Sequence, residues 1–429
     1  MTFSLLAVGD LHLGARPSRL PAELTGRSVE LGTSGAWRRI VDQALEQAVD
    51  AVVLAGDVVE DEDDFFEAYR DLATGVERLL VAGIRIVGIV GNHDVRVLPR
   101  LADQLSGFEL LGRGGEWQSV TLESAGAQLT LHGWSFPSPH YRESPLQHVN
   151  LARGPGTNLG VLHADRDQPA SPYAPVSSAE LREAGLDGWL LGHIHKPDAL
   201  NAESPSGYLG SATGLDPGES GPRGPWLFEL DGGGIRSVTQ WRLAPLHWAR
   251  LPVDLTGITA AEDARERLQA AVHELDDTLI DQRMPPEAAA LRVEFTGRTG
   301  LGAEVARLME RESLGGLHAG TGRIHYFVET LRYLTQPVIE LAELARRADP
   351  AGLLAQRLQL LERQSDDPQR QTLIREAHQH LQEQAGRAHW QALSPRGITE
   401  YDVVDWLQRS GMAALEHLLA QGRGHHDTA

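Results

Sequence analysis

Cysteine is absent from this 429-residue chain, which excludes disulfide bonds and thiolate metal ligands. Lysine is almost absent, because Lys196 is the only one among 39 basic residues. The chain also lacks any run of about 20 apolar residues, the length that a membrane-spanning helix needs. Its first residues carry no basic stretch followed by a long apolar run, as a signal peptide would. We therefore expect a cytoplasmic protein with no membrane partner.

Positive charge is scarce relative to negative charge. The chain has 39 basic against 59 acidic residues, which gives a formal net charge of −20 at pH 7. So acidic a protein does not bind nucleic acid through bulk positive charge. Two ways of accepting a phosphate stay open: a local basic groove, or a site whose cations are metal ions.

The hydrophobic content of 41% is enough for two or three domains that each have a core. In residues 1–245, short apolar strands alternate with amphipathic helices, which predicts a layered α/β domain. Helices are expected over residues 37–48 and 65–80. The expected strands are Leu5–Val8, Ala51–Ala55, Ile84–Val90, Leu129–His132, Leu159–His163, Trp189–Leu191 and Trp226–Leu230.

Two further regions follow this domain. Residues 246–335 again mix strands and helices, which predicts a smaller α/β module. Its expected elements are strands at Trp248–Val253, Leu291–Phe295 and Ile324–Leu331 and helices at Ala260–Ile280 and Glu304–Arg311. Residues 336–429 are predicted to be helical. Leucine stripes in this region either pack on the chain's own core or form a docking surface for a partner helix.

Polar side chains follow five of the strands in residues 1–245. Four of the five groups begin with a glycine, which allows a tight turn and a close approach of a substrate. Because ligands of open α/β folds bind at the carboxyl ends of the strands, these groups can converge. They are Gly9-Asp10-Leu11-His12, Gly56-Asp57, Gly91-Asn92-His93-Asp94, His163 and Gly192-His193-Ile194-His195.

The chemistry of these groups points to a metal site. Asp-x-His and His-x-His each place two side chains on one side of an extended segment, so either pair can chelate one ion. Oxygen donors beside imidazoles suit Mn²⁺, Fe²⁺ or Zn²⁺ better than Ca²⁺. One such turn alone is more often structural than functional. Five of them at matching topological positions predict a metal centre.

The same series resembles the calcineurin-like metallophosphoesterases. The resemblance implies a four-layer α/β/β/α sandwich with a smaller α/β cap domain and a helical C-terminal region. It also implies two divalent ions, with Mn²⁺ favoured. One ion would be held by Asp10, His12, Asp57 and His195, and the other by Asn92, His163 and His193, with Asp57 bridging. His93 matches the family's acid or transition-state donor, and hydrolysis would use a metal-bound hydroxide.

The residues after Asp57 indicate which branch of the superfamily the chain resembles. Phosphomonoesterases of this superfamily often continue with Asp-Arg-Gly, whereas acidic residues follow here. Glu60 stands where the family places an acid or a histidine, and by position it would orient His93 through a hydrogen bond. Asp94 is expected to brace its loop. Five arginines near the motifs are either phosphate contacts or solvated charges: Arg16, Arg19, Arg27, Arg96 and Arg100.

The order of segments after His195 is similar to the nuclease subunit of SbcCD-type DNA repair complexes and to its YhaO-type relatives. That resemblance implies a cap, residues 246–335, that positions DNA, and a helical region, residues 336–429, that docks on an SMC-like ATPase of the SbcC type. Homodimerisation is implied in the same way. We predict a two-metal DNA phosphodiesterase acting as an exonuclease. The alternatives are a small-molecule phosphodiesterase or nucleotide phosphatase, and a largely non-catalytic scaffold that binds DNA ends.

Overall fold

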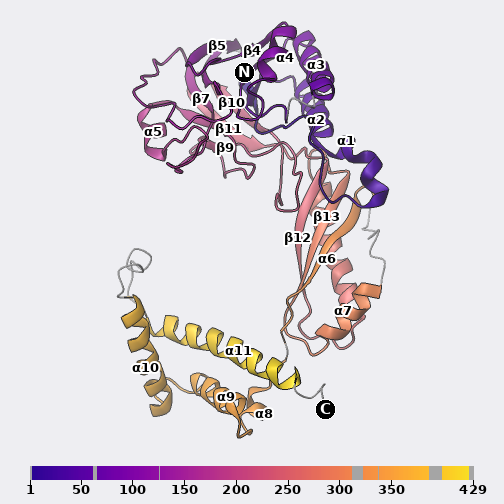
Figure 1. Ribbon diagram of the computed structural model, residues 1–429, viewed down its shortest axis with the longest axis vertical. Coiled ribbons are helices and arrows are strands. Elements are labelled where there is room, and N and C mark those ends of the chain that lie inside the picture. The colour runs from indigo at the N-terminus through magenta and orange to yellow at the C-terminus, as the bar shows by residue number, and fades with distance from the viewer. Residues whose placement is uncertain are drawn as a thin grey trace. The chain divides into compact units, whose positions relative to one another are not determined.

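The computed structural model describes residues 2–60, 65–124, 126–311, 322–336, 338–385 and 399–424. The chain divides into two compact units, which are treated separately below (Figure 1). The first unit contains Met1–Val253, Arg265–Glu294 and Met309–Arg332, and the second contains Asp254–Ala264, Phe295–Leu308 and Tyr333–Ala429. The domain borders predicted at residues 245 and 335 stay a prediction.

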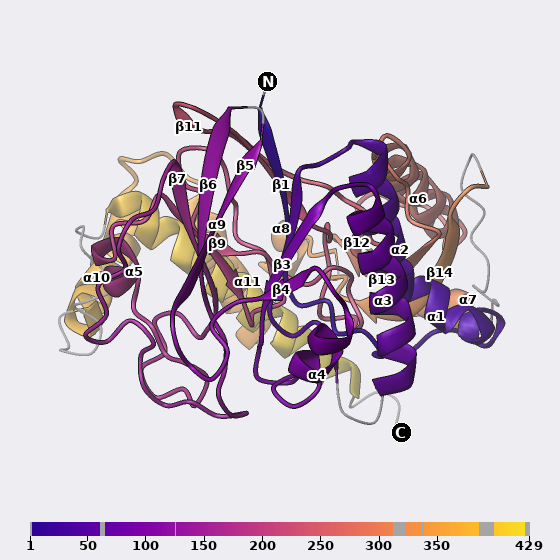
Figure 2. The same cartoon turned by 90° about the horizontal axis from the view of Figure 1, so that it is seen from above.

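A six-stranded sheet forms the centre of the first unit. Its strands in spatial order are β11 (Gly234–Gln240), β10 (Trp226–Asp231), β1 (Phe3–Val8), β2 (Ala51–Ala55), β3 (Arg85–Ile89) and β4 (Phe108–Leu110). Strands β1 to β4 run parallel, and the other two pair antiparallel. Helices α2 (Thr33–Glu46), α3 (Phe65–Val81) and α4 (Leu98–Gln104) pack on one face through their apolar stripes. Figure 2 shows α2 and α3 side by side against this sheet.

A five-stranded sheet covers the other face. Its strands are β5 (Gln118–Ser124), β6 (Ala127–Trp134), β7 (Thr157–His163), β8 (Gly188–Gly192) and β9 (Gly207–Tyr208). Val53 and Ile89 of the first sheet share one core with Leu131 and Val161 of the second. Each such buried side chain contributes roughly 1.5–3 kcal/mol to folding. Helix α5 (Ser178–Glu183) lies on the outer face, so the predicted four-layer sandwich is confirmed.

Four strands of this unit were not predicted, and all four are sheet edges. They are β4, β5, β9 and β11. Edge strands have one free side and often carry polar residues, so their hydrophobic signal is weak. Strand β5 has one buried residue in seven, and β9 has only two residues. The central strands, which are apolar nearly throughout, were predicted to within two residues at each end.

A three-stranded sheet follows the sandwich: β12 (Leu246–Asp254), β13 (Ala288–Thr296) and β14 (His325–Tyr333). Helix α6 (Asp263–Ile280) joins the first two of these strands, and the predicted module elements are all present. Within the first unit, Arg19 forms an ion pair with Glu329, and Arg27 and Arg39 both bind Glu287. Two arginines considered for DNA contact are therefore engaged with carboxylates of this sheet region.

A buried hydrogen bond ties α6 to β14 in the first unit. The Tyr326 hydroxyl donates to Asp276 Oδ1 at 2.8 Å, and both residues are at most 2% exposed. A hydrogen bond to a charged group contributes roughly 1.5–3 kcal/mol. We expect Tyr326→Phe to lower the free energy of unfolding by about that amount, as measured by urea denaturation. An unchanged denaturation midpoint would contradict this role of the pair.

The second unit has a core of its own. Its helices are α7 (Gly302–Arg311), α8 (Leu341–Leu344), α9 (Pro350–Leu361), α10 (Pro368–Ala385) and α11 (Glu400–Gly424). Leu358, Leu361 and Leu415 are buried together between α9 and α11. The leucine stripes therefore pack on the chain's own core. Leu353 and Trp406 stay 60% and 47% exposed. None of the helices in the described part of the chain is long and apolar enough to cross a membrane.

Candidate metal centre

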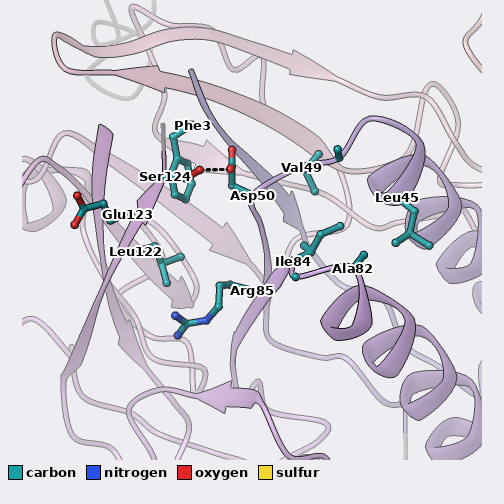
Figure 3. Close-up of a pocket in the computed structure, with 12 residues that line it drawn as sticks. Phe3, Leu45, Val49, Asp50, Ala82, Ile84, Arg85, Leu122, Glu123 and Ser124 are labelled. Atoms are coloured by element: carbon teal, nitrogen blue, oxygen red, sulfur yellow. Dashed lines mark hydrogen bonds between the residues drawn. The ribbon is translucent and has the colours of Figure 1, made fainter. Parts of the chain in front are cut away.

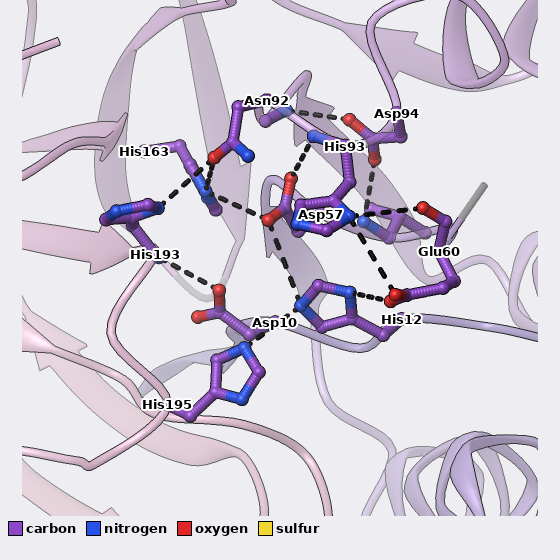
Figure 4. Close-up of polar contacts among 12 residues, drawn as sticks. Asp10, His12, Asp57, Glu60, Asn92, His93, Asp94, His163, His193 and His195 are labelled. Carbon is purple, nitrogen blue, oxygen red and sulfur yellow. Dashed lines mark hydrogen bonds and ion pairs between the residues drawn. The ribbon is translucent and has the colours of Figure 1, made fainter. Parts of the chain in front are cut away.

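The predicted polar groups meet at one edge of the two sheets (Figure 4). Asp10 follows β1, Asp57 follows β2, and Asn92 follows β3 of the first sheet. His163 ends β7 and His193 follows β8 of the second sheet. Because the strands are parallel, their carboxyl ends point the same way, and the sandwich brings the two edges together. All nine residues predicted for the site are labelled in this one close-up, together with Asp94.

The opposite edge of the sandwich has a pocket of about 300 Å³ at the starts of the strands (Figure 3). Its carboxylate Asp50 accepts hydrogen bonds from the backbone and hydroxyl of Ser4 and from Ser124. These bonds join β1, β5 and the loop before β2. Asp50 therefore joins three segments of the fold, and none of the residues predicted for the metal site lines this pocket.

Four site residues have a strained backbone. Asp10, His12, Asp57 and His193 all have positive φ angles, of 38°, 49°, 46° and 100°. Side chains with a Cβ rarely adopt this region, and each instance costs about 1–3 kcal/mol. Such strain persists only where the surrounding structure fixes it, and it concentrates at functional sites. Here it turns acid and imidazole groups from successive strands toward one point.

Two glycines make the close packing of these loops possible. A Cβ on Gly91 would lie 2.1 Å from Asp57 Oδ1, and a Cβ on Gly192 would lie 2.2 Å from the Ala55 carbonyl oxygen. Both distances are far shorter than a van der Waals contact. The predicted close approach at these glycines is thus required by the fold.

We expect Gly91→Ala to displace the Asp57 carboxylate and to weaken Mn²⁺ binding by at least tenfold, a loss of about 1.4 kcal/mol. Isothermal titration with Mn²⁺ measures this affinity. Gly232→Ala is a matched control, because a Cβ there meets nothing within 4 Å and Gly232, like Gly91, has no positive φ. Equal metal affinity in both variants would show that Gly91 is not needed for the site.

His12 and His195 form one half of the site. Their Nε2 atoms face each other at 3.1 Å, and His12 Nε2 lies 3.8 Å from Asp57 Oδ2. Asp10 contributes a buried Oδ2 that has no hydrogen-bond partner among the described residues. A buried carboxylate oxygen without a partner is costly unless a cation binds it. This donor set fits a divalent metal ion.

Asn92, His163 and His193 form the other half. Asn92 Oδ1 lies 3.1 Å from His163 Nε2 and 3.2 Å from His193 Nδ1. His163 Nε2 also lies 3.2 Å from Asp57 Oδ2, the oxygen that faces His12. One oxygen of Asp57 therefore borders both halves. A carboxylate oxygen in this position is within reach of a cation in either half.

Each of the four candidate histidine ligands has a second ring nitrogen that faces an oxygen atom of the protein. His12 Nδ1 binds Glu60 at 2.5 Å, and His163 Nδ1 binds the Ala55 carbonyl oxygen at 3.1 Å. His195 Nδ1 binds Glu219, and His193 Nε2 lies 3.5 Å from Asp165. In the neutral ring, a proton on the outer nitrogen would leave the inner nitrogen free to bind a cation. Metal-binding histidines show this pattern almost without exception.

The carboxylates make the site strongly negative. Burial alone would lower the pKa of His12, but Glu60, Asp57 and Asp10 outweigh it and raise the pKa to about 9. Burial would also lower the pKa of His163, but the Asp57 carboxylate opposes this effect and raises the pKa of His163 to about 9. Although burial would raise the pKa of Asp57, His163 and His12 hold it well below its ordinary value. Metal ions would take over the charge balance that protons supply here.

His93 is more exposed than these groups, although its ring lies 5.1 Å from the His12 ring and near Glu60. Its side chain is 44% exposed, whereas those of His12 and His163 are at most 4% exposed. Its backbone N–H donates to Asp57 Oδ1 at 2.9 Å, and its Nδ1 lies 3.3 Å from the Glu60 carbonyl oxygen. The ring is therefore held at Nδ1 and open to a substrate at Nε2.

Glu60 and Asp94 have different structural roles. The Glu60 carboxylate lies 2.5 Å from His12 Nδ1 and 3.9 Å from His93 Nδ1, so it orients His12 first. The hydrogen bond from His93 reaches its carbonyl oxygen instead. Asp94 is fully buried and accepts from the backbone N–H groups of Val58 and Gly91. It therefore braces the two loops, as expected.

Sequence reasoning missed two acidic residues of the site. Asp165 lies two positions after His163, a spacing that could have suggested a partner for the site. Glu219 lies in a loop between β9 and β10, and no motif marks it. The acidic residues at 61–64 lie outside the described residues.

Residues 3–197 match the family described as calcineurin-like phosphoesterase. These residues form a calcineurin-like phosphoesterase domain. Residues 248–336 match the middle domain of metallophosphoesterase YhaO, so a second, YhaO-type domain follows the phosphoesterase domain. The predicted resemblance to the calcineurin-like phosphoesterases and to YhaO-type proteins is confirmed for these two domains. Sequence and fold together identify a metal-binding hydrolase domain of the phosphoesterase kind.

The chain is also similar to two curated relatives and one solved structure. The chain is 25% identical over 318 residues to the "Uncharacterized metallophosphoesterase YhaO" of Bacillus subtilis, covering 68% of this chain and 72% of that protein. It is 25% identical over 294 residues to the "DNA double-strand break repair protein Mre11" of Methanopyrus kandleri, covering 61% of each. The calcineurin-like phosphoesterase YfkN of Bacillus subtilis aligns with a TM-score of 0.38 at 13% identity, over 65% of this chain and 98% of that one.

Proposed function

We propose that the protein is a two-metal-dependent DNA phosphodiesterase and the exonuclease subunit of an SbcCD-like repair complex. The observation that carries the proposal is the position of Asp57 Oδ2. It lies 3.8 Å from His12 Nε2 and 3.2 Å from His163 Nε2, between two sets of inward-facing donors. The relative named as a DNA double-strand break repair protein supports DNA as the substrate.

The proposed ligands divide into two sets. Asp57 bridges them. One set is Asp10, His12, Asp57 and His195, and the other is Asp57, Asn92, His163 and His193. Bound divalent ions, Mn²⁺ in our proposal, would neutralise the phosphate and make a water molecule nucleophilic. These ions also explain how so acidic a chain accepts a phosphate diester.

The chain's own groups account for the remaining chemistry. His93 is the exposed imidazole beside the bridging carboxylate, and its Nδ1 is held by the Glu60 carbonyl oxygen. Its Nε2 is the atom available to donate a proton to the leaving oxygen. Glu60 binds His12 Nδ1 and so orients the ring with Nε2 toward the proposed metals. General acid catalysis of this kind contributes roughly 10²–10⁴-fold to the rate.

The regions after the phosphoesterase domain fit the same proposal. We assign residues 246–335 to a cap that positions DNA, and residues 336–429 to docking on an SMC-like ATPase of the SbcC type. Exposed Leu353 and Trp406 of the helical region offer apolar surface for such a partner. A cytoplasmic location and a homodimer belong to the proposal as well.

A panel of substrates tests the proposal against its alternatives. The purified chain with Mn²⁺ is incubated with end-labelled linear duplex, nicked circle, single-stranded DNA and a bis-aryl phosphodiester, each with a chelator control. We expect mononucleotide release from the linear duplex, abolished by the chelator. Turnover of the small ester with intact DNA would favour a small-molecule phosphodiesterase. DNA binding without any turnover would favour a scaffold.

A further inference from the structure

The loop Thr213–Gly224 reaches from the metal centre to the strand that begins the second domain. Its residue Glu219 binds His195 Nδ1 with one carboxylate oxygen. The other oxygen accepts the backbone N–H of Leu215 at 2.8 Å. Both oxygens are thus used, and the side chain is held in one orientation. The His195 ring is held with it, so that Nε2 faces His12.

Arg223 fixes the backbone that carries His195. Its guanidinium donates to the His195 carbonyl oxygen and, at 3.3 Å, to the Glu219 carbonyl oxygen. The residue is only 4% exposed, which is unusual for arginine. The same loop therefore holds His195 at two points, the ring through Glu219 and the main chain through Arg223.

The loop itself is fastened to β12. The Trp248 indole N–H donates to the Gly214 carbonyl oxygen at 3.0 Å, and the Gly221 N–H donates to the Trp248 carbonyl oxygen at 3.0 Å. Trp248 is 1% exposed and packs with Leu246 and Phe327. A third contact, from Ser18 N–H to the Leu215 carbonyl oxygen at 2.8 Å, joins the loop after the first motif.

We propose that Glu219 is a positioning residue for the metal ligand His195, and that Trp248 sets the position of its loop. The YhaO-type domain would then influence the affinity of one metal through this loop, without touching the metal. The inference rests on the proposed metal centre. Carboxylates in this role change metal affinity by 10–100-fold when they are removed.

The test is a Mn²⁺ titration of the full chain by calorimetry, with bound Mn²⁺ counted by electron paramagnetic resonance. We expect two Mn²⁺ in the wild type. Glu219→Ala should weaken one of them by 10–100-fold and leave the other within a few-fold. Glu219→Gln should reduce the Mn²⁺ affinity less, because the amide oxygen of glutamine still accepts a hydrogen bond from His195. Trp248→Phe, which keeps a ring but not the N–H, should weaken the same Mn²⁺ by a smaller factor.

Glu109→Gln is the control, because it removes a carboxylate that forms an ion pair with Arg85 on β3, away from the metal centre. The melting temperature in chelator separates folding from binding. Glu219→Gln is used where Glu219→Ala does not fold. Unchanged Mn²⁺ affinities in folded Glu219 variants would overturn the role of Glu219. An unchanged Mn²⁺ affinity in Trp248→Phe would overturn the link to β12. A wild type that binds no Mn²⁺ would instead overturn the proposed function, and this inference with it.

Discussion

His93→Ala is expected to lower the rate of phosphodiester hydrolysis by roughly 10²–10⁴-fold while the chain still binds two Mn²⁺. The substituted side chain is 44% exposed, and its ring meets the His12 ring edge-on with 5.1 Å between the ring centroids. The contact that His93 makes with Asp57 comes from its backbone N–H, which alanine keeps. The metal centre should therefore stay intact while the proton donor is lost.

Single-turnover hydrolysis of end-labelled duplex, together with a Mn²⁺ titration, measures both parts of this prediction. His273→Ala is the control, because that histidine binds its own helix at Gln269 and lies outside the site. A His93→Ala variant with wild-type turnover would remove His93 from the mechanism. A variant that loses Mn²⁺ would make His93 a metal-site residue instead of a proton donor.

Asp57→Asn is expected to have the largest effect of all, with loss of both metals and of detectable hydrolysis. One oxygen of Asp57 borders both halves of the site, at 3.8 Å from His12 Nε2 and 3.2 Å from His163 Nε2. A neutral amide at this position cannot offset the charge of two divalent ions. Among the described residues, Asp57 is the carboxylate that lies within 4 Å of both of these nitrogens, whereas Asp10 lies near both halves at a longer distance.

Metal content after gel filtration, measured by plasma mass spectrometry, checks this expectation. Asp103→Asn is a matched control, because it removes a carboxylate that is 63% exposed and paired with Arg113. We expect about the wild-type metal content in the control and less than one Mn²⁺ per chain in Asp57→Asn. Two tightly bound Mn²⁺ in Asp57→Asn would contradict the bridging role.

The sequence was most informative where two physical constraints coincide. A central parallel strand is apolar throughout, and a ligand at its end is polar, so each of the five strand ends is marked by an abrupt change. That contrast was enough to predict Asp10, Asp57 and His163, all of which the structure brings together. The left-handed backbone at Asp10 and Asp57 could not be predicted from the sequence, because residues other than glycine adopt it only in a small minority of positions.

The outer contacts of the site could not be predicted in the same way. Glu219 follows no strand and belongs to a loop of glycines and prolines, so its approach to His195 depends on the folded path of that loop. Glu60 was expected to orient His93, but its carboxylate lies closer to His12. The choice between two imidazoles depends on distances of a few ångströms, which a motif does not encode. The edge strands were not predicted because their sequences lack an apolar pattern.

In the function that we propose, five strand ends form one two-metal centre bridged by Asp57. Anomalous diffraction at the manganese edge, from crystals grown with Mn²⁺, tests it most directly. We predict two peaks about 3.5–4 Å apart. One should lie between His12 and His195, the other among Asn92, His163 and His193, with Asp57 contacting both. A single peak, or two peaks that do not share Asp57, would contradict the account.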